Sequence, residues 1–307
     1  MKRLTVVLLC LAAGCAAERP AQFAAAGPVP APASQDGKLR IIAFGAHPDD
    51  NEIRLAGTAA KWAALGHQVK FVAVTNGDIG HWREAGGPLA RRRAAESQAT
   101  AKILGVTMQV LDIHDGELEP TLENRRTITR LIRDWKADIV LGHRPNDYHP
   151  DHRAVGQLIQ DASYMVTVPF FCPDTPPLAS NPVFLSYEDN FTRPNPFRAD
   201  IVVATDDVLE KKLAAMEALP SQFYEGGANG GPQLVPSDEA GKTRRKNEVR
   251  ESFRRQFTRT ATEYRAKLRE LYGAQRGDAA QTAEAFEISE YGRRPSAEQI
   301  KKLFPFF

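Results

Sequence analysis

Short apolar runs and segments of helical periodicity alternate along the first half of the chain. Apolar runs of strand length occur at four places: 40–46, 68–75, 108–113 and 138–143. Each is followed by apolar residues at helical spacing, which predict helices at 55–66, 91–104, 122–135 and 151–165. This order predicts an α/β fold with a mostly parallel sheet and helices on both faces.

The second half of the chain has a less regular pattern. Two apolar runs predict strands at 183–188 and 200–205, and helical spacing returns at 206–219. Asp207 and Glu210 match the start of a capping box at the beginning of that helix. Two further segments follow, namely a glycine-rich loop at 225–233 and a long charged helix at 243–272. Beyond residue 272 the pattern predicts no particular element.

The N-terminus has the features of an export signal. A basic start precedes an apolar stretch at 4–13, which is too short to span a bilayer and has the length of a signal-peptide core. The small residues before Cys15 resemble the lipobox of bacterial lipoproteins, so residues 1–15 predict a signal that ends in a lipid-bearing cysteine. An ordinary signal peptide cut near Ala16 is the alternative.

An Ala/Pro-rich segment without periodicity follows at residues 16–38 and predicts an extended tether. The predicted arrangement is therefore an exported lipoprotein, anchored in the membrane and facing the periplasm or the cell exterior. The folded domain would occupy residues 39–307 and would include a C-terminal helical elaboration.

Composition adds two constraints. With 40 basic and 38 acidic residues the formal charge is +2, which gives no argument for nucleic-acid binding. Of the three cysteines, only Cys172 lies in the predicted domain, so the fold must be stable without an internal disulfide. Oligomeric state is not predicted by any of these features.

Two clusters of histidine and aspartate follow predicted strands. "AHPDDNE" (46–52) comes directly after the first strand, and "RPNDYHPDHR" (144–153) after the fourth. In parallel sheets ligands bind outside the carboxyl ends of the strands, so the two clusters can face each other across one crevice. Either cluster alone is also compatible with a turn or a helix cap. Both together favour a metal site.

The residue types suit a catalytic metal. His47 and Asp50, three residues apart, can point the same way, and one imidazole of the second cluster completes a set of two histidines and one carboxylate. Asp49 is then placed to take a proton from a bound water. The four histidines without comparable company are predicted to be surface or internally satisfied residues: His67, His81, His114 and His143.

These motifs carry a resemblance to a known family. "AHPDDNE…LAGT" and "HPDH", together with "TNGDIG" and "LDIHDGEL", are similar to segments of the PIG-L/LmbE-like family of zinc-dependent N-deacetylases, which act on N-acetylglucosamine-type sugars. The similarity extends over residues 40–224, with a weaker match at 283–292. It implies a Rossmann-like α/β fold with the metal site at the carboxyl ends of the strands.

The resemblance implies a role for each motif residue. His47, Asp50 and His152 would be the metal ligands, and Asp49 would be the general base. The metal expected is Zn²⁺, although the same ligands accept Fe²⁺, Co²⁺ or Ni²⁺.

Four further residues receive roles from the same resemblance. His149 would be the protonated partner that stabilises the oxyanion or protonates the leaving amine, and Asp151 would orient it. Arg93 and Asp115 would contact sugar hydroxyls.

The chain departs from the family pattern in two places. Many members have Gly-Gly where this chain has Ala56-Gly57, and residues 225–250 form a local elaboration expected to shape the substrate entrance.

The predicted function is a zinc-dependent hydrolase that removes the N-acetyl group from an N-acetylglucosamine-type sugar. The alternatives are a metal-dependent amidase or esterase for another small substrate, or a non-catalytic metal- or sugar-binding lipoprotein. Asp49 argues against a protein that only binds a metal or a sugar, because such a protein needs no carboxylate beside a metal-bound water.

Overall fold

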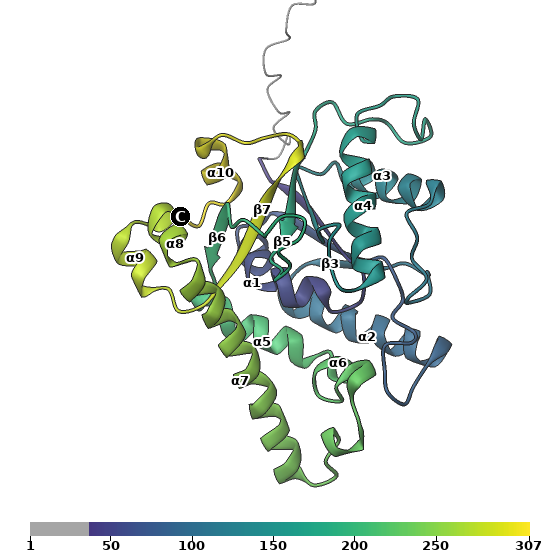
Figure 1. The fold of residues 1–307 in the computed structure, drawn as a ribbon, viewed down its shortest axis with the longest axis vertical. Helices are drawn as coiled ribbons and strands as arrows, with labels where there is room; N and C mark the ends of the chain where they lie inside the picture. Colours follow the sequence, from purple (N-terminus) through teal and green to yellow (C-terminus); the bar gives the residue numbers. More distant parts are fainter. Residues whose placement is uncertain (1–36) are drawn as a thin grey trace, which may run out of the picture. The chain divides into compact units, whose positions relative to one another are not determined.

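The structure is a computed structural model that describes residues 37–307 (Figure 1). The predicted signal, the lipobox-like cysteine and the tether lie outside the described residues. None of the helices between residues 37 and 307 is long and apolar enough to cross a membrane.

One seven-stranded sheet forms the centre of the fold, with the strand order β3-β2-β1-β4-β5-β7-β6. The first five strands pair in parallel, whereas β7 runs antiparallel to both β5 and β6. The predicted mostly parallel sheet is therefore confirmed. The strands are β1 (Arg40–Gly45), β2 (Gln68–Ala73), β3 (Thr107–Val110), β4 (Ile139–Gly142), β5 (Val183–Tyr187), β6 (Ile201–Ala204) and β7 (Ala283–Gly292).

Helices cover the sheet on both faces, as expected for a parallel sheet whose central strands are buried on both sides. Trp62, Leu104 and Phe304 belong to one buried apolar cluster, and Ile132 and Leu158 belong to another. The helices are α1 (Asp50–Ala64), α2 (Gly86–Leu104), α3 (Leu122–Trp135), α4 (Pro150–Met165), α5 (Leu209–Glu217), α6 (Pro220–Phe223), α7 (Glu239–Glu263), α8 (Arg265–Tyr272), α9 (Ala274–Ala279) and α10 (Ala297–Leu303).

The pattern did not predict β7, which lies between β5 and β6 (Figure 1). Its first four residues are all buried, and one of them is Glu284. The polar residues of the segment do not fall at every second position, so it lacks the alternation of polar and apolar residues that identifies a strand in sequence.

Two predicted helix features were wrong in detail. The helix predicted at 243–272 is divided at Tyr264, where α7 ends and α8 begins. The capping box of Asp207 does not form, because no side-chain cap bond is present and α5 begins only at Leu209. Asp207 instead binds the ammonium of Lys61 at 2.7 Å.

Candidate metal centre

The first cluster lies on the tight connection between β1 and α1. A Cβ atom at Gly45 would lie 2.8 Å from Cβ of Asp50, so only glycine permits this close return of the chain. The carbonyl of His47 accepts the backbone N–H of Asp49 at 2.9 Å, and the carboxylate of Asp50 accepts the backbone N–H of His47 at 2.8 Å. These bonds fix the aspartates at the start of α1.

The second cluster lies at the start of α4, beyond the end of β4. Pro150 occupies the first turn, where its missing N–H is not needed. His149 is the N-cap residue, and its Nδ1 accepts the backbone N–H of Asp151 at 3.2 Å. His152 follows on the same turn and is buried.

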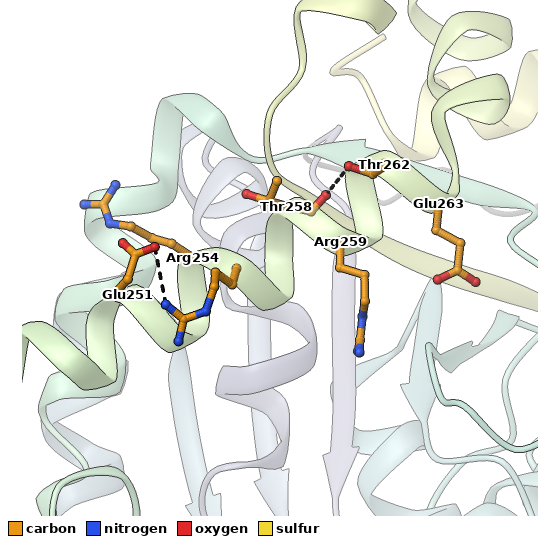
Figure 2. A pocket seen from close by; sticks show the side chains of 7 residues that line it. Glu251, Arg254, Thr258, Arg259, Thr262 and Glu263 are labelled. Carbon is orange, nitrogen blue, oxygen red and sulfur yellow. Dashed lines mark hydrogen bonds and ion pairs between the residues drawn. The ribbon is translucent and has the colours of Figure 1, made fainter.

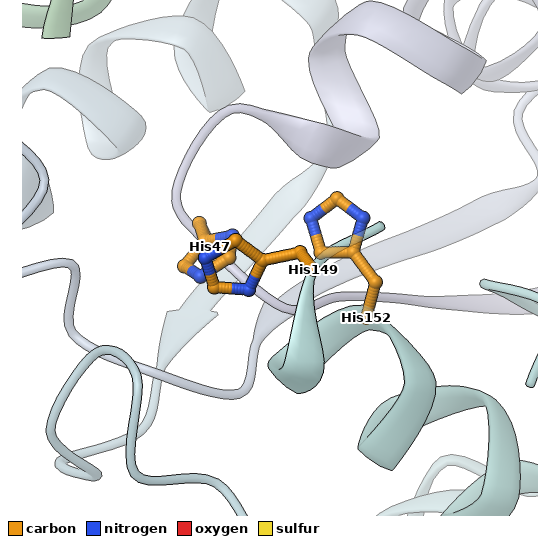
Figure 3. A group of neighbouring side chains, drawn as sticks. All are labelled: His47, His149 and His152. Carbon is orange, nitrogen blue, oxygen red and sulfur yellow. The ribbon is translucent and has the colours of Figure 1, made fainter. Parts of the chain in front are cut away.

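The two clusters meet, as predicted. Nδ1 of His47 lies 3.5 Å from Oδ2 of Asp50, and Nε2 of His152 lies 3.3 Å from Oδ1 of Asp50. Figure 3 shows the rings of His47, His149 and His152 gathered from the two chain segments. Two overlapping groups that include His152 have donor atoms within 4.8 Å of one another and could hold a metal: His47–His149–His152 and Asp50–His143–His152. A third group, His47–Asp115–Asp151, shares His47, and none of the groups found among the described residues combines His47, Asp50 and His152.

His143 lies inside the site. Of the two positions predicted for it, on the surface or internally satisfied, the structure has the second: it is buried, it stacks on His152 with ring centroids 3.9 Å apart, and its Nε2 lies 3.2 Å from Asp50. Burial lowers its pKa, so the ring is neutral and able to donate to a metal. A signal was present, because His143 stands directly at the carboxyl end of a predicted strand.

The electrostatics of the cluster fit a cation. Burial would raise the pKa of Asp50, but His152 and His143 outweigh burial and hold that pKa well below its usual range. Burial also opposes protonation of His152, yet Asp50 and Asp147 raise its pKa to about 9. Oδ1 of Asp147 lies 3.1 Å from Nδ1 of His152, although the two are not aligned as a hydrogen bond. A buried carboxylate that retains its charge beside several imidazoles is a donor set that a divalent metal fits, with the metal replacing the proton of His152.

Asp49 stands beside this cluster. Its carboxylate belongs to neither of the two overlapping groups, and its side chain is 15% exposed. Burial raises its pKa to about 6, while the nearby guanidinium of Arg93 limits the rise. A carboxylate with a pKa slightly below neutral is suited to accept a proton at pH 7.

Arg93 does not occupy the predicted position at the sugar. Its side chain is only 2% exposed, and its Nη2 donates to the carbonyl of Pro48 at 2.9 Å and lies 3.3 Å from Oδ2 of Asp49. A Cβ atom at either Gly77 or Gly80 would lie 2.5 Å from Nη1, so a glycine-bearing loop encloses the guanidinium. Arg93 therefore supports the loop of the first cluster rather than presenting its charge to solvent.

Asp151 also has different partners from those expected. Its fully buried carboxylate accepts the backbone N–H groups of Gly116 at 2.7 Å and Leu118 at 3.2 Å, and lies 3.3 Å from Nε2 of His47. Its contact with His149 comes from its backbone N–H instead. The carboxylate is thus placed to orient His47, which corrects the prediction that it orients His149.

Asp115 lies on the same side of His47. Its Oδ1 is 3.0 Å from Nε2 of His47, and the residue is 6% exposed. The predicted contact with sugar hydroxyls would therefore require a substrate that reaches the base of the site. With Asp50 near Nδ1 and two carboxylates near Nε2, the imidazole of His47 is held at both nitrogens.

His149 has a lowered pKa, because it is partly buried and lies beside His47. Its ring centroid is 4.5 Å from that of His47. The prediction of a protonated His149 is therefore not met in this arrangement, since the ring is neutral at pH 7. Because Nδ1 accepts the N–H of Asp151, the neutral ring carries its proton on Nε2.

The segment after residue 225 packs against the loop that encloses Arg93. Nε2 of His81 lies 3.0 Å from Glu225, and the N–H of Trp82 donates to the carbonyl of Gly227 at 2.9 Å. Glu225 also forms an ion pair with Arg92. The start of the elaboration therefore lies against the loop next to the site, and its role in shaping the substrate entrance stays a prediction.

A separate hollow lies along α7 and is distinct from the metal centre (Figure 2). It is lined by charged and hydroxyl side chains, among which Arg255 pairs with Glu251, and Thr262 donates to the carbonyl of Thr258. None of its lining residues belongs to the histidine and aspartate clusters of the described chain.

Comparison with known proteins agrees with this geometry. The family model described as GlcNAc-PI de-N-acetylase (PIG-L) matches residues 42–163, a range that contains both clusters. A diacetylchitobiose deacetylase of Thermococcus kodakarensis is 34% identical over 197 residues, which are 61% of this chain and 71% of the relative. A 4-oxalmesaconate hydratase of Pseudomonas putida is 25% identical over 191 residues, covering 60% of this chain and 74% of the relative.

A solved structure shares the fold. The N,N'-diacetylchitobiose deacetylase from Pyrococcus horikoshii superposes with a TM-score of 0.62 at 24% identity, over 81% of this chain and 83% of that one.

Proposed function

Since this chain belongs to the GlcNAc-PI de-N-acetylase (PIG-L) family and is a hydrolase of amide bonds, we propose that it removes the N-acetyl group from an N-acetylglucosamine-type sugar or glycoconjugate. The products are acetate and a free amino sugar. The observation that supports this most is the position of Asp49, a base of suitable pKa directly beside a buried cluster of metal donors.

The proposed metal is Zn²⁺, held by His47, Asp50 and His152, with His143 as a further candidate donor. When bound, Zn²⁺ polarises the acetamide carbonyl and lowers the pKa of its water to about 7. Asp151 and Asp115 would hold the Nε2 side of His47, as carboxylates commonly do for metal-bound imidazoles.

Asp49 takes the proton of the attacking water in this proposal. Its carboxylate is not a member of either donor group, so it remains free to act as a base. Arg93, 3.3 Å away, keeps part of the population ionised against the effect of burial. General-base catalysis of this kind contributes about 10²–10⁴-fold to the rate.

His149 supports the developing negative charge. It is neutral with the proton on Nε2, so it donates a hydrogen bond to the carbonyl oxygen as that oxygen becomes negative. The proton for the leaving amine is the one that Asp49 takes from the water, and Asp49 passes it to the amine nitrogen as the C–N bond breaks.

The test is acetate release by the full, Zn²⁺-loaded chain from N-acetylglucosamine, diacetylchitobiose and longer N-acetylated oligosaccharides. Asp49→Ala serves as the paired variant. We expect release from at least one sugar, lost by about 10²–10⁴-fold in the variant while bound metal is retained.

Two other outcomes would replace the proposal. Turnover of non-sugar amides or esters alone would assign a different hydrolase substrate. Because one relative is named 4-oxalmesaconate hydratase, hydration of 4-oxalmesaconate is assayed in parallel, and that activity without acetate release would exclude deacetylation.

We also propose export and lipid anchoring through Cys15, based on the sequence of residues 1–15. The full chain and a Cys15→Ser variant are expressed in a bacterium and fractionated. The parent is expected in the membrane fraction and the variant in the soluble fraction. If the parent and the variant distribute equally between the membrane and soluble fractions, Cys15 does not anchor the protein.

A further inference from the structure

A fully buried ion pair lies below the metal centre, outside all the roles assigned above. Nζ of Lys212 on α5 is 2.7 Å from Oε1 of Glu284 on β7, and the two residues are 0% and 4% exposed. Phe257 of α7 covers the ammonium, whose Nζ is 3.5 Å from the ring centroid. Buried ion pairs contribute little net stability compared with apolar side chains of similar volume, so this pair calls for another explanation.

Both members of the pair hold the middle of α1. Oε1 of Glu284 accepts the N–H of Gly57 at 2.8 Å, and Oε2 accepts both the N–H of Thr58 at 2.7 Å and its hydroxyl at 2.6 Å. Nζ of Lys212 donates to the carbonyl of Ile53 at 2.9 Å. Ile53 and Gly57 are four residues apart, so their C=O and N–H are the two groups that an α-helix joins directly. The ion pair therefore bridges one step of the helical hydrogen-bond ladder.

Gly57 is required for this approach. A Cβ atom there would lie 2.7 Å from Cγ2 of Thr205 and 3.1 Å from Oε1 of Glu284. Its neighbour Ala56 is buried in the apolar core and tolerates its methyl group. The ion pair therefore requires glycine only at the second position of the family's Gly-Gly pattern, which is Gly57 in this chain. The alanine at the first position, Ala56, does not disturb the contact.

The helix segment that the pair holds begins at Ile53, in the turn that carries the site. The N–H of Ile53 donates to the carbonyl of Asp49 at 3.0 Å, and Asp50 is the first residue of α1. The carbonyl of Ile53 is in turn held by Lys212. A shift of this turn would move Asp50 relative to His152, which comes from a different helix.

We propose that Lys212 and Glu284 are positioning residues for the metal centre. They fix the first turn of α1, so that Asp50 meets the imidazoles of the second cluster and Asp49 stays beside them. The inference rests on the proposed metal site, but it concerns metal binding and not the identity of the substrate.

The test uses the double variant Lys212→Met/Glu284→Gln of the full chain, which leaves no unpaired buried charge. Trp62→Phe is the control, because Trp62 lies on the same helix and its replacement removes core packing and the bond from its indole N–H to the carbonyl of Leu303 without touching the ion pair. Metal affinity is measured by titration with Co²⁺, the ligand arrangement by the Co²⁺ absorption bands, and stability by thermal unfolding.

We expect the double variant to bind Co²⁺ about 10–100-fold more weakly and with shifted absorption bands, as is typical when residues that orient metal ligands are lost. The control should lose stability while keeping both properties. Thr58→Val, which removes one bond to Glu284 without changing charge, should show a smaller change in the same direction.

If the double variant or Thr58→Val keeps the parent's affinity and bands while only its melting temperature falls, the pair is structural and the proposal is overturned. Absence of acetate release would reject the proposed substrate class without affecting this result.

Discussion

His143 shows how much a single imidazole adds to the site. Its Nε2 faces Asp50 at 3.2 Å, and its ring stacks on His152, so it touches two of the three predicted ligands. A neutral, buried imidazole in this position either donates to the metal itself or holds the carboxylate that does. In both cases the role of His143 depends on a ring nitrogen, so an aromatic ring of similar shape without nitrogen cannot replace it.

His143→Phe tests that conclusion, because it keeps an aromatic ring and removes the nitrogens. We expect the affinity for Zn²⁺ to fall by about 10–100-fold. His67→Phe is the matched control, since His67 is remote in sequence from both clusters and its Nδ1 accepts only the backbone N–H of Leu39. Competition with a chromogenic chelator gives both affinities. Equal affinities of the two variants would show that His143 does not contribute to metal binding.

The sequence predicted which segments form the site better than it predicted the contacts of single residues. That the segments of His47, Asp50 and one imidazole of the second cluster meet could be predicted from the strand ends, whereas the choice of His152 came from the family resemblance. The partners of Arg93 and Asp151 could not be predicted, because the carbonyl of Pro48 and the backbone of Gly116 are positioned only by the folded loops. His143 stands alone at the end of its predicted strand, and a single histidine there is a weaker signal than the two clusters of histidine and aspartate.

At the scale of elements, α4 must lie very close to the connection that follows β4. A Cβ atom at Gly156 would lie 2.6 Å from the carbonyl carbon of Arg144 and 2.7 Å from N of Pro145. These are backbone atoms, which cannot rotate away as a side chain can. This contact sets the distance between α4, with His152 on its first turn, and the end of β4.

Gly156→Ala should therefore push α4 outward. We expect a loss of about 1–3 kcal/mol in the free energy of unfolding, as is typical of an overpacked core, together with weaker metal binding. Gly87→Ala is the control, because its added Cβ would meet only a flexible arginine at 3.3 Å. Urea unfolding and metal titration of both variants check this, and an unchanged stability of Gly156→Ala would contradict the packing argument.

The elements themselves were predicted to different degrees, for a physical reason. The parallel strands β1 to β5 are rich in apolar residues, and helices of clear periodicity separate them, so their type and order follow from the pattern. β7 contains Glu284, whose burial depends on Lys212 and on the backbone of α1, partners that lie far away in sequence. No local pattern can indicate that such a glutamate is internal.

At the scale of the whole molecule, the metal centre joins parts of the chain about a hundred residues apart. Asp50 begins α1, His143 follows β4, and His152 lies on α4, while Asp115 comes from the connection after β3. Unfolding separates all of them, so the unfolded chain cannot reproduce the donor set. A metal that binds here must therefore stabilise the entire domain and not only the loops around it.

Removal of metal should consequently lower the melting temperature. At a free metal concentration about 100 times the dissociation constant, binding adds about 2.7 kcal/mol to the stability, or on the order of 5–10 °C for a domain of this size. Scanning calorimetry with Zn²⁺ and with excess chelator measures the difference. His152→Ala has lost one proposed ligand, so its melting temperature should be the same in both conditions. If the parent's melting temperature does not respond to metal, or if the variant responds equally, the stabilising metal lies elsewhere and the cluster around Asp50 is not its site.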